Sequence, residues 1–434
     1  MEISVEGGFV IRLAEAIEIA IGTIKTRKLR GEGLHAPGDS GIEWITLDWF
    51  SDAPDSFSQA LDETGVHTVP AAWRHVQGTR IVGVDGSSRR FSTPYGSLAL
   101  ATVALTLGPL PLIDYPPLGY EYPISCGLTE PFIAAYATLG VKHDLIATES
   151  PAGHPYEPPP SLGGSEGGRK GYALADIAHE VRTRLETLGL RIAVQAAEEG
   201  SLILLDGPLY QRPWRHEVRR SPYLKDDWRE LTRERVETLR EASERGIAVV
   251  GSVKRLDKSR LLVKAHGSLS GCLGFTFPPQ ENDQAEVIQL VSFYVKKGKL
   301  SGFEPLLVGP LSMKPSEELK SEIGVDMPEL IYSYIVLPQL PYSGSLDSPC
   351  GVLRLEVLRE VYDSENLDVF YRALGEGVMQ GLPLPPAQAF ADARCRQTSR
   401  ALFEQMCKTA LMEGVELTYD TWLVYNRAGE EYAE

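Results

Sequence analysis

The chain has 434 residues, of which 43% are hydrophobic and 24% are charged, so it can bury a sizeable core as one large domain or two smaller ones. Lys and Arg together number 43 and Asp and Glu 59, which gives a formal net charge of -16 at pH 7. Because affinity for phosphate comes from clustered basic residues, this balance excludes a protein that coats nucleic acid by bulk electrostatics and leaves room only for a local basic site.

The five cysteines are scattered and never arranged Cys-x-x-Cys, which disfavours both a disulfide framework and a zinc knuckle. Glutamates within the first twenty residues do not fit a signal peptide. No uninterrupted apolar run reaches the roughly 18 residues that a membrane span requires. We therefore expect a cytoplasmic protein with no membrane partner.

Residues 9–30 are predicted to form a helix, because apolar residues recur there at helical spacing and basic residues gather at the C-terminal end. Glycine and proline punctuate residues 31–43, which we interpret as a linker to a main domain of residues 44–425. The helix carries Ile17, Ile19, Ile21 and Ile24 close together. They either pack on the chain's own core or form a partner or dimer contact, so residues 1–43 are a candidate interface.

Short apolar runs alternate with helical patterns from about residue 78 to residue 250. The runs predict strands at residues 81–84, 96–107, 110–115, 201–205 and 247–250. Apolar residues at the 3.6-residue period predict helices at residues 173–199 and 226–245. The first three strands are joined by short connections, as in an antiparallel meander.

The remaining chain is predicted to add mixed elements. Further strands are expected at residues 283–296, 331–337, 351–357 and 417–425, a helix at 386–411, and a Pro/Gly-rich loop at 151–172. A meander followed by strand–helix alternation is the order of a ribonuclease H-like sheet. We therefore predict an α/β fold: a ribonuclease H-like mixed sheet flanked by helices, with a core at about residues 78–400, insertions and an N-terminal helical extension.

Two aspartates stand where an apolar strand is predicted to stop and a glycine turn to begin. Asp85 precedes Gly86, and Asp206 precedes Gly207. A carboxylate at the end of a buried strand is costly unless something there requires negative charge. If the two strands are neighbours, the carboxylates meet, and a divalent cation is the usual reason for such a pair. The alternative is ordinary turn chemistry, since Asp-Gly is a common turn dipeptide.

Six short motifs, in their order along the chain, resemble the NurA family. They are residues 84–87 (Val-Asp-Gly-Ser), 184–186 (Arg-Leu-Glu), 204–209 (Leu-Leu-Asp-Gly-Pro-Leu), 251–254 (Gly-Ser-Val-Lys), 353–356 (Leu-Arg-Leu-Glu) and 381–388 (Gly-Leu-Pro-Leu-Pro-Pro-Ala-Gln). The resemblance implies a prokaryotic DNA-end nuclease with a ribonuclease H-like fold and a divalent metal, usually manganese. It also implies a homodimer bound to the hexameric DNA translocase HerA.

The resemblance also implies roles for individual residues. Asp85 and Asp206 are similar to the family's two metal-binding aspartates. Glu186 is similar to its helix-borne glutamate, with Glu180 on the same helix as a rival. Lys254 is similar to the basic residue near the scissile phosphate.

The strand with Arg354 and Glu356 matches a family strand of structural or DNA-facing role. The sequence departs from the family pattern where an Ala-His pair opens the last helix. Here that position is Ala387 followed by Gln388. A glutamine can bind a hard cation through its carbonyl oxygen. Asp392, one helical turn further on the same face, is a second candidate for the fourth ligand.

Phosphodiester hydrolysis needs an activated water, a Lewis acid and charge compensation on the leaving oxygen. A carboxylate site with two Mn²⁺ or Mg²⁺ ions supplies all three. Asp85 is the expected bridging ligand, Asp206 and Glu186 complete the set, and Lys254 would stabilise the developing charge. Taken alone, Glu186 is more typical of a solvated helix residue and Lys254 of a surface charge, so only their combination favours a site.

We expect a metal-dependent deoxyribonuclease that processes single- or double-stranded DNA ends as an exonuclease, with endonuclease activity as a further option, in concert with a HerA-type hexameric ATPase. Its role would be DNA repair and end resection, or phage defence. The alternative is a catalytically weakened, non-enzymatic subunit of the same assembly that binds DNA ends or the partner. The absent family histidine supports this alternative, whereas the three retained carboxylates favour the enzyme.

Overall fold

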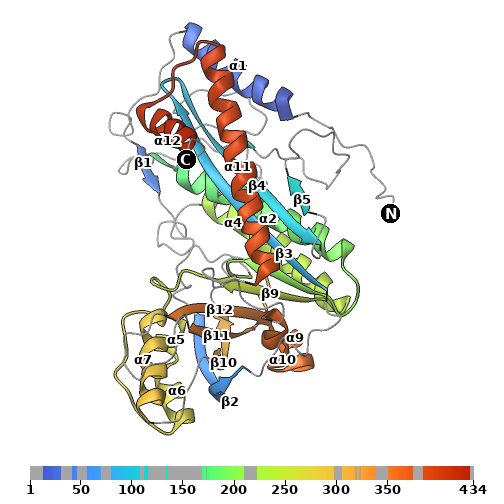
Figure 1. Ribbon diagram of the computed structural model, residues 1–434, viewed down its shortest axis with the longest axis vertical. Helices are drawn as coiled ribbons and strands as arrows, with labels where there is room; N and C mark the ends of the chain where they lie inside the picture. The colour runs from blue at the N-terminus through green and yellow to red at the C-terminus, as the bar shows by residue number, and fades with distance from the viewer. Residues whose placement is uncertain are drawn as a thin grey trace.

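A ten-stranded mixed sheet runs through the protein, whose computed structural model describes residues 13–30, 42–45, 56–69, 80–107, 112–115, 133–134, 169–172, 174–209, 222–297, 305–317, 320–321, 324–338, 350–374 and 385–430 (Figure 1). Its strands are β2 (Ser56–Thr68), β3 (Ile81–Thr93), β4 (Gly96–Leu107), β5 (Leu112–Tyr115), β6 (Ile133–Ala134), β8 (Leu202–Asp206), β9 (Ala248–Val253), β10 (Leu306–Pro315), β11 (Leu330–Pro338) and β12 (Cys350–Leu358). Two further strands, β1 (Ile42–Ile45) and β7 (Arg169–Tyr172), pair in parallel as a small second sheet.

The large sheet has the order β2-β10-β11-β12-β9-β8-β3-β4-β5, and β6 also pairs with β4. β3, β4 and β5 form an antiparallel meander, and β8 and β9 follow on the other side of β3 in parallel orientation. This half is the ribonuclease H-like sheet, so the predicted α/β fold is confirmed. The other half, from β12 to β2, extends it with antiparallel strands.

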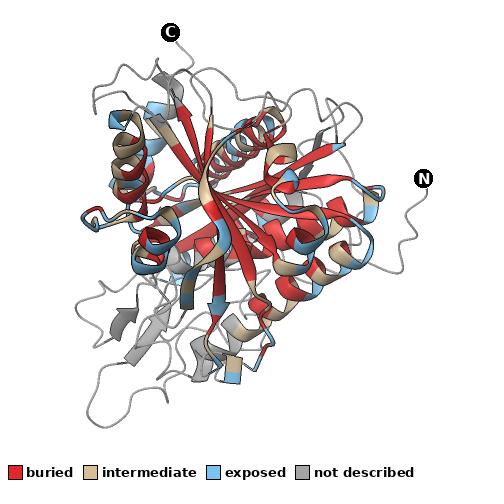
Figure 2. Ribbon diagram, turned by 90° about the horizontal axis from the view of Figure 1, so that it is seen from below, coloured by how far each residue is buried: buried red, intermediate tan, exposed pale blue. Residues whose placement is uncertain are grey.

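Helices cover both faces of the sheet. They are α1 (Leu13–Arg30), α2 (Leu174–Ala196), α4 (Pro222–Glu244), α5 (Leu261–Lys264), α6 (His266–Leu273), α7 (Asp283–Lys296), α9 (Arg359–Glu365), α10 (Asp368–Ala373), α11 (Pro386–Met412) and α12 (Tyr419–Glu430). Figure 1 shows α11 crossing in front of β3 and β4, with α2 and α4 behind them. The strands between these layers are mostly buried (Figure 2).

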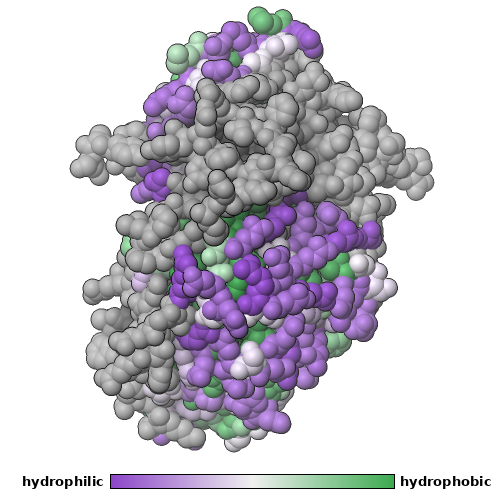
Figure 3. Space-filling view, turned by 90° about the vertical axis from the view of Figure 1, so that its right-hand side faces the viewer, coloured by the Kyte–Doolittle hydropathy of each residue, from purple (hydrophilic) through white to green (hydrophobic). Residues whose placement is uncertain are grey.

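The surface is polar where it is described. On the face shown in Figure 3, hydrophilic side chains predominate, with hydrophobic ones scattered among them, as on ordinary protein surfaces. No helix within the described ranges is long and apolar enough to cross a membrane.

The helix predicted at residues 9–30 is α1, and residues 1–12 and 31–41 of the predicted N-terminal unit lie outside the described residues. Ile17, Ile21 and Ile24 are buried, and α1 packs against α11. Lys25 and Lys28 of α1 form ion pairs with Glu413 and Glu416 beyond the end of α11. These three isoleucines therefore belong to the chain's own core, the first of the two alternatives. β1 begins at Ile42, so the last two residues of the linker predicted at 31–43 belong to a strand.

Two predicted strands are helices. Residues 283–296 form α7, because Val287, Leu290 and Val291 are buried at helical spacing and the Asn282 side chain caps the helix by accepting a hydrogen bond from the Ala285 N–H. Residues 419–425, within the strand predicted at 417–425, belong to α12. The Pro/Gly-rich loop lies outside the described residues except at β7.

Candidate active site

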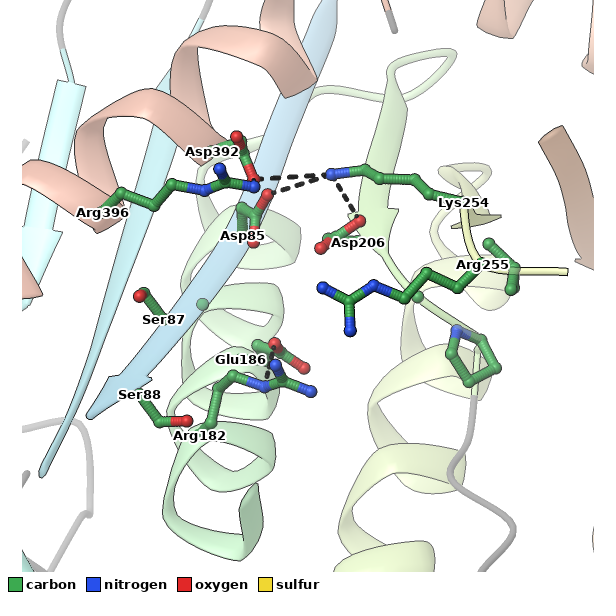
Figure 4. A pocket seen from close by; sticks show the side chains of 14 residues that line it. Asp85, Ser87, Ser88, Arg182, Glu186, Asp206, Lys254, Arg255, Asp392 and Arg396 are labelled. Carbon is green, nitrogen blue, oxygen red and sulfur yellow. Dashed lines mark hydrogen bonds and ion pairs between the residues drawn. The ribbon is translucent and has the colours of Figure 1, made fainter. Parts of the chain in front are cut away.

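A cavity of about 330 Å³ opens where the C-terminal ends of β8 and β9 lie beside the middle of β3 (Figure 4). Its walls come from β3, α2, α11 and the segments that follow β8 and β9. The lining residues are Asp85, Gly86, Ser87, Ser88, Arg182, Glu186, Asp206, Gly207, Pro208, Val253, Lys254, Arg255, Asp392 and Arg396.

Asp85 and Asp206 enter the cavity from neighbouring parallel strands. Val84 of β3 pairs with Leu205 of β8, so the next residue on each strand is one of the two aspartates. The predicted turn at Asp206 is confirmed, because β8 ends there and Gly207 has φ +88°. The predicted turn at Asp85 is wrong. β3 continues through Asp85 to Thr93, because its later residues still pair with β4.

Asp392 reaches the cavity because α11 lies very close to β3. A Cβ atom added to Gly83 would lie 2.3 Å from the carbonyl oxygen of Ala387, so only glycine permits this approach. Thr106 on β4 joins the two elements: its Oγ1 accepts from the Gly83 N–H at 2.7 Å and donates to the Ala387 carbonyl at 3.1 Å. The first turns of α11 are thereby fixed over Asp85.

Three carboxylates meet as a result. One oxygen each from Asp85, Asp206 and Asp392 lie within 4.8 Å of one another. The Lys254 ammonium, just past the end of β9, lies 2.8 Å from Oδ1 of Asp206 and 3.6 Å from both Oδ2 of Asp85 and Oδ1 of Asp392 (Figure 4). We call these three aspartates the acidic triad.

Burial and neighbouring charges shift the pKa values of two groups at the triad. Burial, followed by the nearby charge of Asp206, raises the pKa of Asp85 well above its ordinary value. Burial alone would lower the pKa of Lys254, but the charges of Asp206 and Asp85 outweigh it and raise that pKa. Lys254 pairs with all three carboxylates and Arg396 pairs with Asp392 at 2.9 Å, so two protein cations face three carboxylates.

Two oxygens of this region suit a cation. Oδ2 of Asp85 and Oε1 of Gln388 are buried and have no hydrogen-bond donor among the described residues. A buried acceptor without a donor is costly, and a hard divalent cation would compensate it. Gln388, on α11, is fully buried and directs its Nε2 at Oδ1 of Asp206, 3.3 Å away. The donor set is all oxygen, which fits Mg²⁺ or Mn²⁺.

Glu186 lines the same cavity but lies outside the triad. Side chains alternate across a strand, so Asp85 faces α11, whereas Val84 and Gly86 face α2, which carries Glu186. Its carboxylate pairs with Arg182 at 3.3 Å and with the buried Arg235 at 3.8 Å. Burial raises the pKa of Glu186 despite both arginines. The side chain of Glu180, its rival on α2, lies outside the described ones.

Arg354 and Glu356 are both buried on β12, beside the loop that follows Asp206. Arg354 Nε donates to Oε1 of Glu356 at 3.0 Å, and Oε2 of Glu356 accepts from the Leu209 N–H at 3.1 Å. This pair therefore supports the loop behind the cavity, which fits the structural role of the two alternatives.

Sequence reasoning did not single out the arginines of the site: Arg182, Arg255 and Arg396 line the cavity, and Arg235 pairs with Glu186 from behind it. Arg396 pairs with Asp392 at 2.9 Å, and Arg182 with Glu186, each at a spacing of four residues on one helix. That spacing is a visible signal for Arg182 and Arg396. The pairing of Arg235 on α4 with Glu186 on α2 has no local signal, because it depends on how the two helices pack.

The chain is similar to the family described as the NurA domain over residues 79–390. None of the curated proteins matches it. Among solved structures, it is similar to the crystal structure of the NurA nuclease from Sulfolobus solfataricus, with 14% sequence identity, 83% of this chain and 89% of that chain covered, and a TM-score of 0.38.

The family match contains every predicted site residue except Asp392, which lies two positions beyond its end. It covers well over half of the sequence. The chain belongs to the NurA domain family.

Proposed function

We propose that this protein is a metal-dependent nuclease that hydrolyses phosphodiester bonds at DNA ends. The observation that carries the proposal is the acidic triad with its donor-free buried oxygen, set beside cationic side chains in one cavity of a ribonuclease H-like sheet. Membership of the NurA family, whose resemblance implies DNA-end processing, supports the same conclusion.

Asp85, Asp206 and Asp392 would hold the metal, with Oε1 of Gln388 as a further ligand. When bound, Mn²⁺ or Mg²⁺, as one or two ions, supplies a Lewis acid and makes a water nucleophile available at neutral pH. Glu186, which the resemblance implies as a ligand, lines the same cavity and forms ion pairs with two arginines.

Cationic side chains of the cavity would receive the phosphate. Lys254 lies among the carboxylates, so its ammonium can neutralise charge that develops on a phosphate held there. Arg182, Arg255 and Arg396 also line the cavity. In a chain with a net charge of -16, such a local group of cations is what allows contact with DNA.

The partners follow from the resemblance: a homodimer that works with a HerA-type hexameric ATPase, in DNA repair and end resection or in phage defence. Residues 1–43 remain the proposed contact. Within α1 the exposed side chains are the candidates, such as Leu29 at 79% exposed, because Ile17 and Ile21 are buried in the chain itself. Leu29→Glu should therefore reduce co-elution with the ATPase while preserving the melting temperature.

The function is tested by incubating linear single- and double-stranded DNA with the full chain and Mn²⁺, with EDTA as the metal-free arm. Asp206→Asn keeps the side-chain volume but removes the ligand charge, and should abolish cleavage with folding unchanged. Asp257→Asn, at an exposed carboxylate outside the cavity, is the matched control. Cleavage by Asp206→Asn within tenfold of the wild type would contradict the assignment.

The second candidate is the non-enzymatic subunit, which binds DNA ends or the partner. The observation that favours it is Gln388, which stands where the family resemblance implies a histidine. This second candidate predicts that the wild-type protein binds DNA but does not cleave it with Mn²⁺. The same incubation therefore distinguishes it from a nuclease.

A further inference from the structure

The cavity has two chemically different ends. Figure 4 shows Asp85, Asp206, Asp392 and Lys254 together at one end, and Ser88, Arg182 and Glu186 at the other. The first end is the acidic triad with its ammonium. The second end adds to the Glu186 carboxylate a hydroxyl and a guanidinium, which are donors suited to an anion rather than to a metal.

Arg182 is held in place by its own helix. Its Nε lies 3.3 Å from Oε1 of Glu186, four residues ahead, and its Nη2 lies 2.9 Å from Nδ1 of His179, three residues behind. The stem lies against β3, because a Cβ atom added to Gly86 would be 3.0 Å from Cγ of Arg182. A guanidinium ordered in this way loses little conformational entropy when it binds an anion.

Of the two arginines that pair with Glu186, one lines the cavity. Glu186 carries one negative charge and has two arginine partners. Arg235 is buried away from the cavity and donates to Oγ1 of Thr187 and to the carbonyls of Leu209 and Thr183. Arg182 instead lines the cavity, and its side chain is 22% exposed.

The cavity volume limits what can bind. About 330 Å³ is at the small end of ligand sites, which suits one nucleotide unit of a strand and not a duplex. A strand whose scissile phosphate lies at the triad would place its next phosphate further along the cavity, toward the donors that Arg182 and Ser88 supply.

We propose that Arg182, with Ser88, binds the phosphate next to the scissile one in a single DNA strand. This inference rests on the proposed nuclease function for the meaning of the triad end, but the binding itself is measurable without cleavage. Phosphate neutralisation by arginine is bidentate and directional, so the site fixes the register of the strand as well as adding affinity.

The binding test uses a fluorescein-labelled single-stranded oligonucleotide and the full chain carrying Asp206→Asn in EDTA, so that no cleavage occurs. Adding Arg182→Gln should weaken binding by about tenfold and reduce the slope of log K against log salt by about 0.7, the value for one phosphate contact on a single strand. Arg182→Lys should retain most of the affinity. Arg191→Gln, on the same helix and outside the cavity, is the matched control and should change neither quantity.

Wild-type affinity and salt slope in the Arg182→Gln protein would overturn the proposal. So would equal losses in the Arg182→Gln and Arg191→Gln proteins, because the effect would then be non-local. If wild-type protein with Mn²⁺ leaves DNA uncut, the nuclease function fails, while this binding result still decides the subsite.

A cleavage arm identifies the phosphate. A neutral methylphosphonate linkage adjacent to the cleaved bond should slow the wild type at least tenfold on one side of that bond. The Arg182→Gln protein should already have a raised KM, because it lacks the contact with this phosphate. The same linkage should therefore slow it less than twofold. Equal slowing of both proteins would place Arg182 at another phosphate and contradict the assignment.

Discussion

Nζ of Lys254 lies 2.8 Å from Oδ1 of Asp206, and the same ammonium lies 3.6 Å from carboxylate oxygens of Asp85 and Asp392. One protein cation therefore sits among the three carboxylates that would hold a divalent ion. Lys254 partly neutralises the acidic triad when no metal is bound, so its ammonium and a metal ion would compete for the same carboxylates.

Lys254→Met should lower the stability of the metal-free protein by on the order of 1–2 kcal/mol, because the triad loses its counter-charge at a partly exposed site. The same variant should gain more stability from Mn²⁺ than the wild type does. Calorimetric melting in EDTA and in Mn²⁺ measures both effects. Lys258→Met, at an exposed lysine outside the cavity, is the control. Identical melting of the Lys254→Met and wild-type proteins in EDTA would contradict this account.

Asp85→Asn should abolish cleavage and stabilise the metal-free fold at neutral pH. The pKa of Asp85 is raised in the folded protein, first by burial and then by Asp206, so the folded state binds that proton more tightly than the unfolded chain does. The group's destabilising contribution therefore begins as the pH rises above the pKa of the unfolded chain, and it is complete once the pH exceeds the folded pKa. Replacing it with a neutral side chain removes the opposing contribution.

The expected gain in melting temperature is on the order of 2 °C at about pH 7 in EDTA, and it should vanish as the pH falls to about 4. Calorimetry over this pH range measures it. Asp257→Asn, at an exposed carboxylate, should show no such trend. A melting temperature below that of the wild type at neutral pH would show that the carboxylate is stabilising and that its pKa is not raised.

Gln388→His should retain or increase metal-dependent cleavage, because the family resemblance implies a histidine at this position and an imidazole nitrogen can take the place of Oε1. Gln388→Leu removes the oxygen and should weaken the response to Mn²⁺, seen as a higher metal concentration for half-maximal rate. Oε1 of Gln388 is buried without a donor, which motivates both variants. A loss of more than tenfold in rate for Gln388→His, with folding intact, would give Gln388 a role of its own.

Gly83→Ala should destabilise the protein by about 1–3 kcal/mol and reduce cleavage, because the new Cβ atom would lie 2.3 Å from the backbone oxygen of Ala387. The helix start would have to move away from β3, and Asp392 with it. Gly22→Ala, on α1 with no atom within 4 Å of the added Cβ, should be neutral or stabilising. Urea unfolding compares the two. Similar stability changes in both would mean that α11 has room to shift.

The sequence by itself determined the local elements and one turn of the site. Helical periodicity located α2, α4 and α11, and the apolar run ending in Asp-Gly located the end of β8 with Asp206 at its tip. These features depend on residues close together in the chain, where spacing and turn chemistry act directly. The same rules misassigned residues 283–296, since an apolar run is compatible with a helix or a strand until its neighbours are known.

Tertiary structure alone decided which carboxylates meet. Asp85 lies within β3 because β4 continues to pair with it, and a local Asp-Gly signal does not record that pairing. Asp392 joins Asp85 and Asp206 because α11 approaches β3 at Gly83. Glu186 stays apart because α2 covers the opposite face and Arg235 reaches it from α4. Distances between side chains from different elements follow from strand order and helix packing, and local sequence patterns carry no information about either.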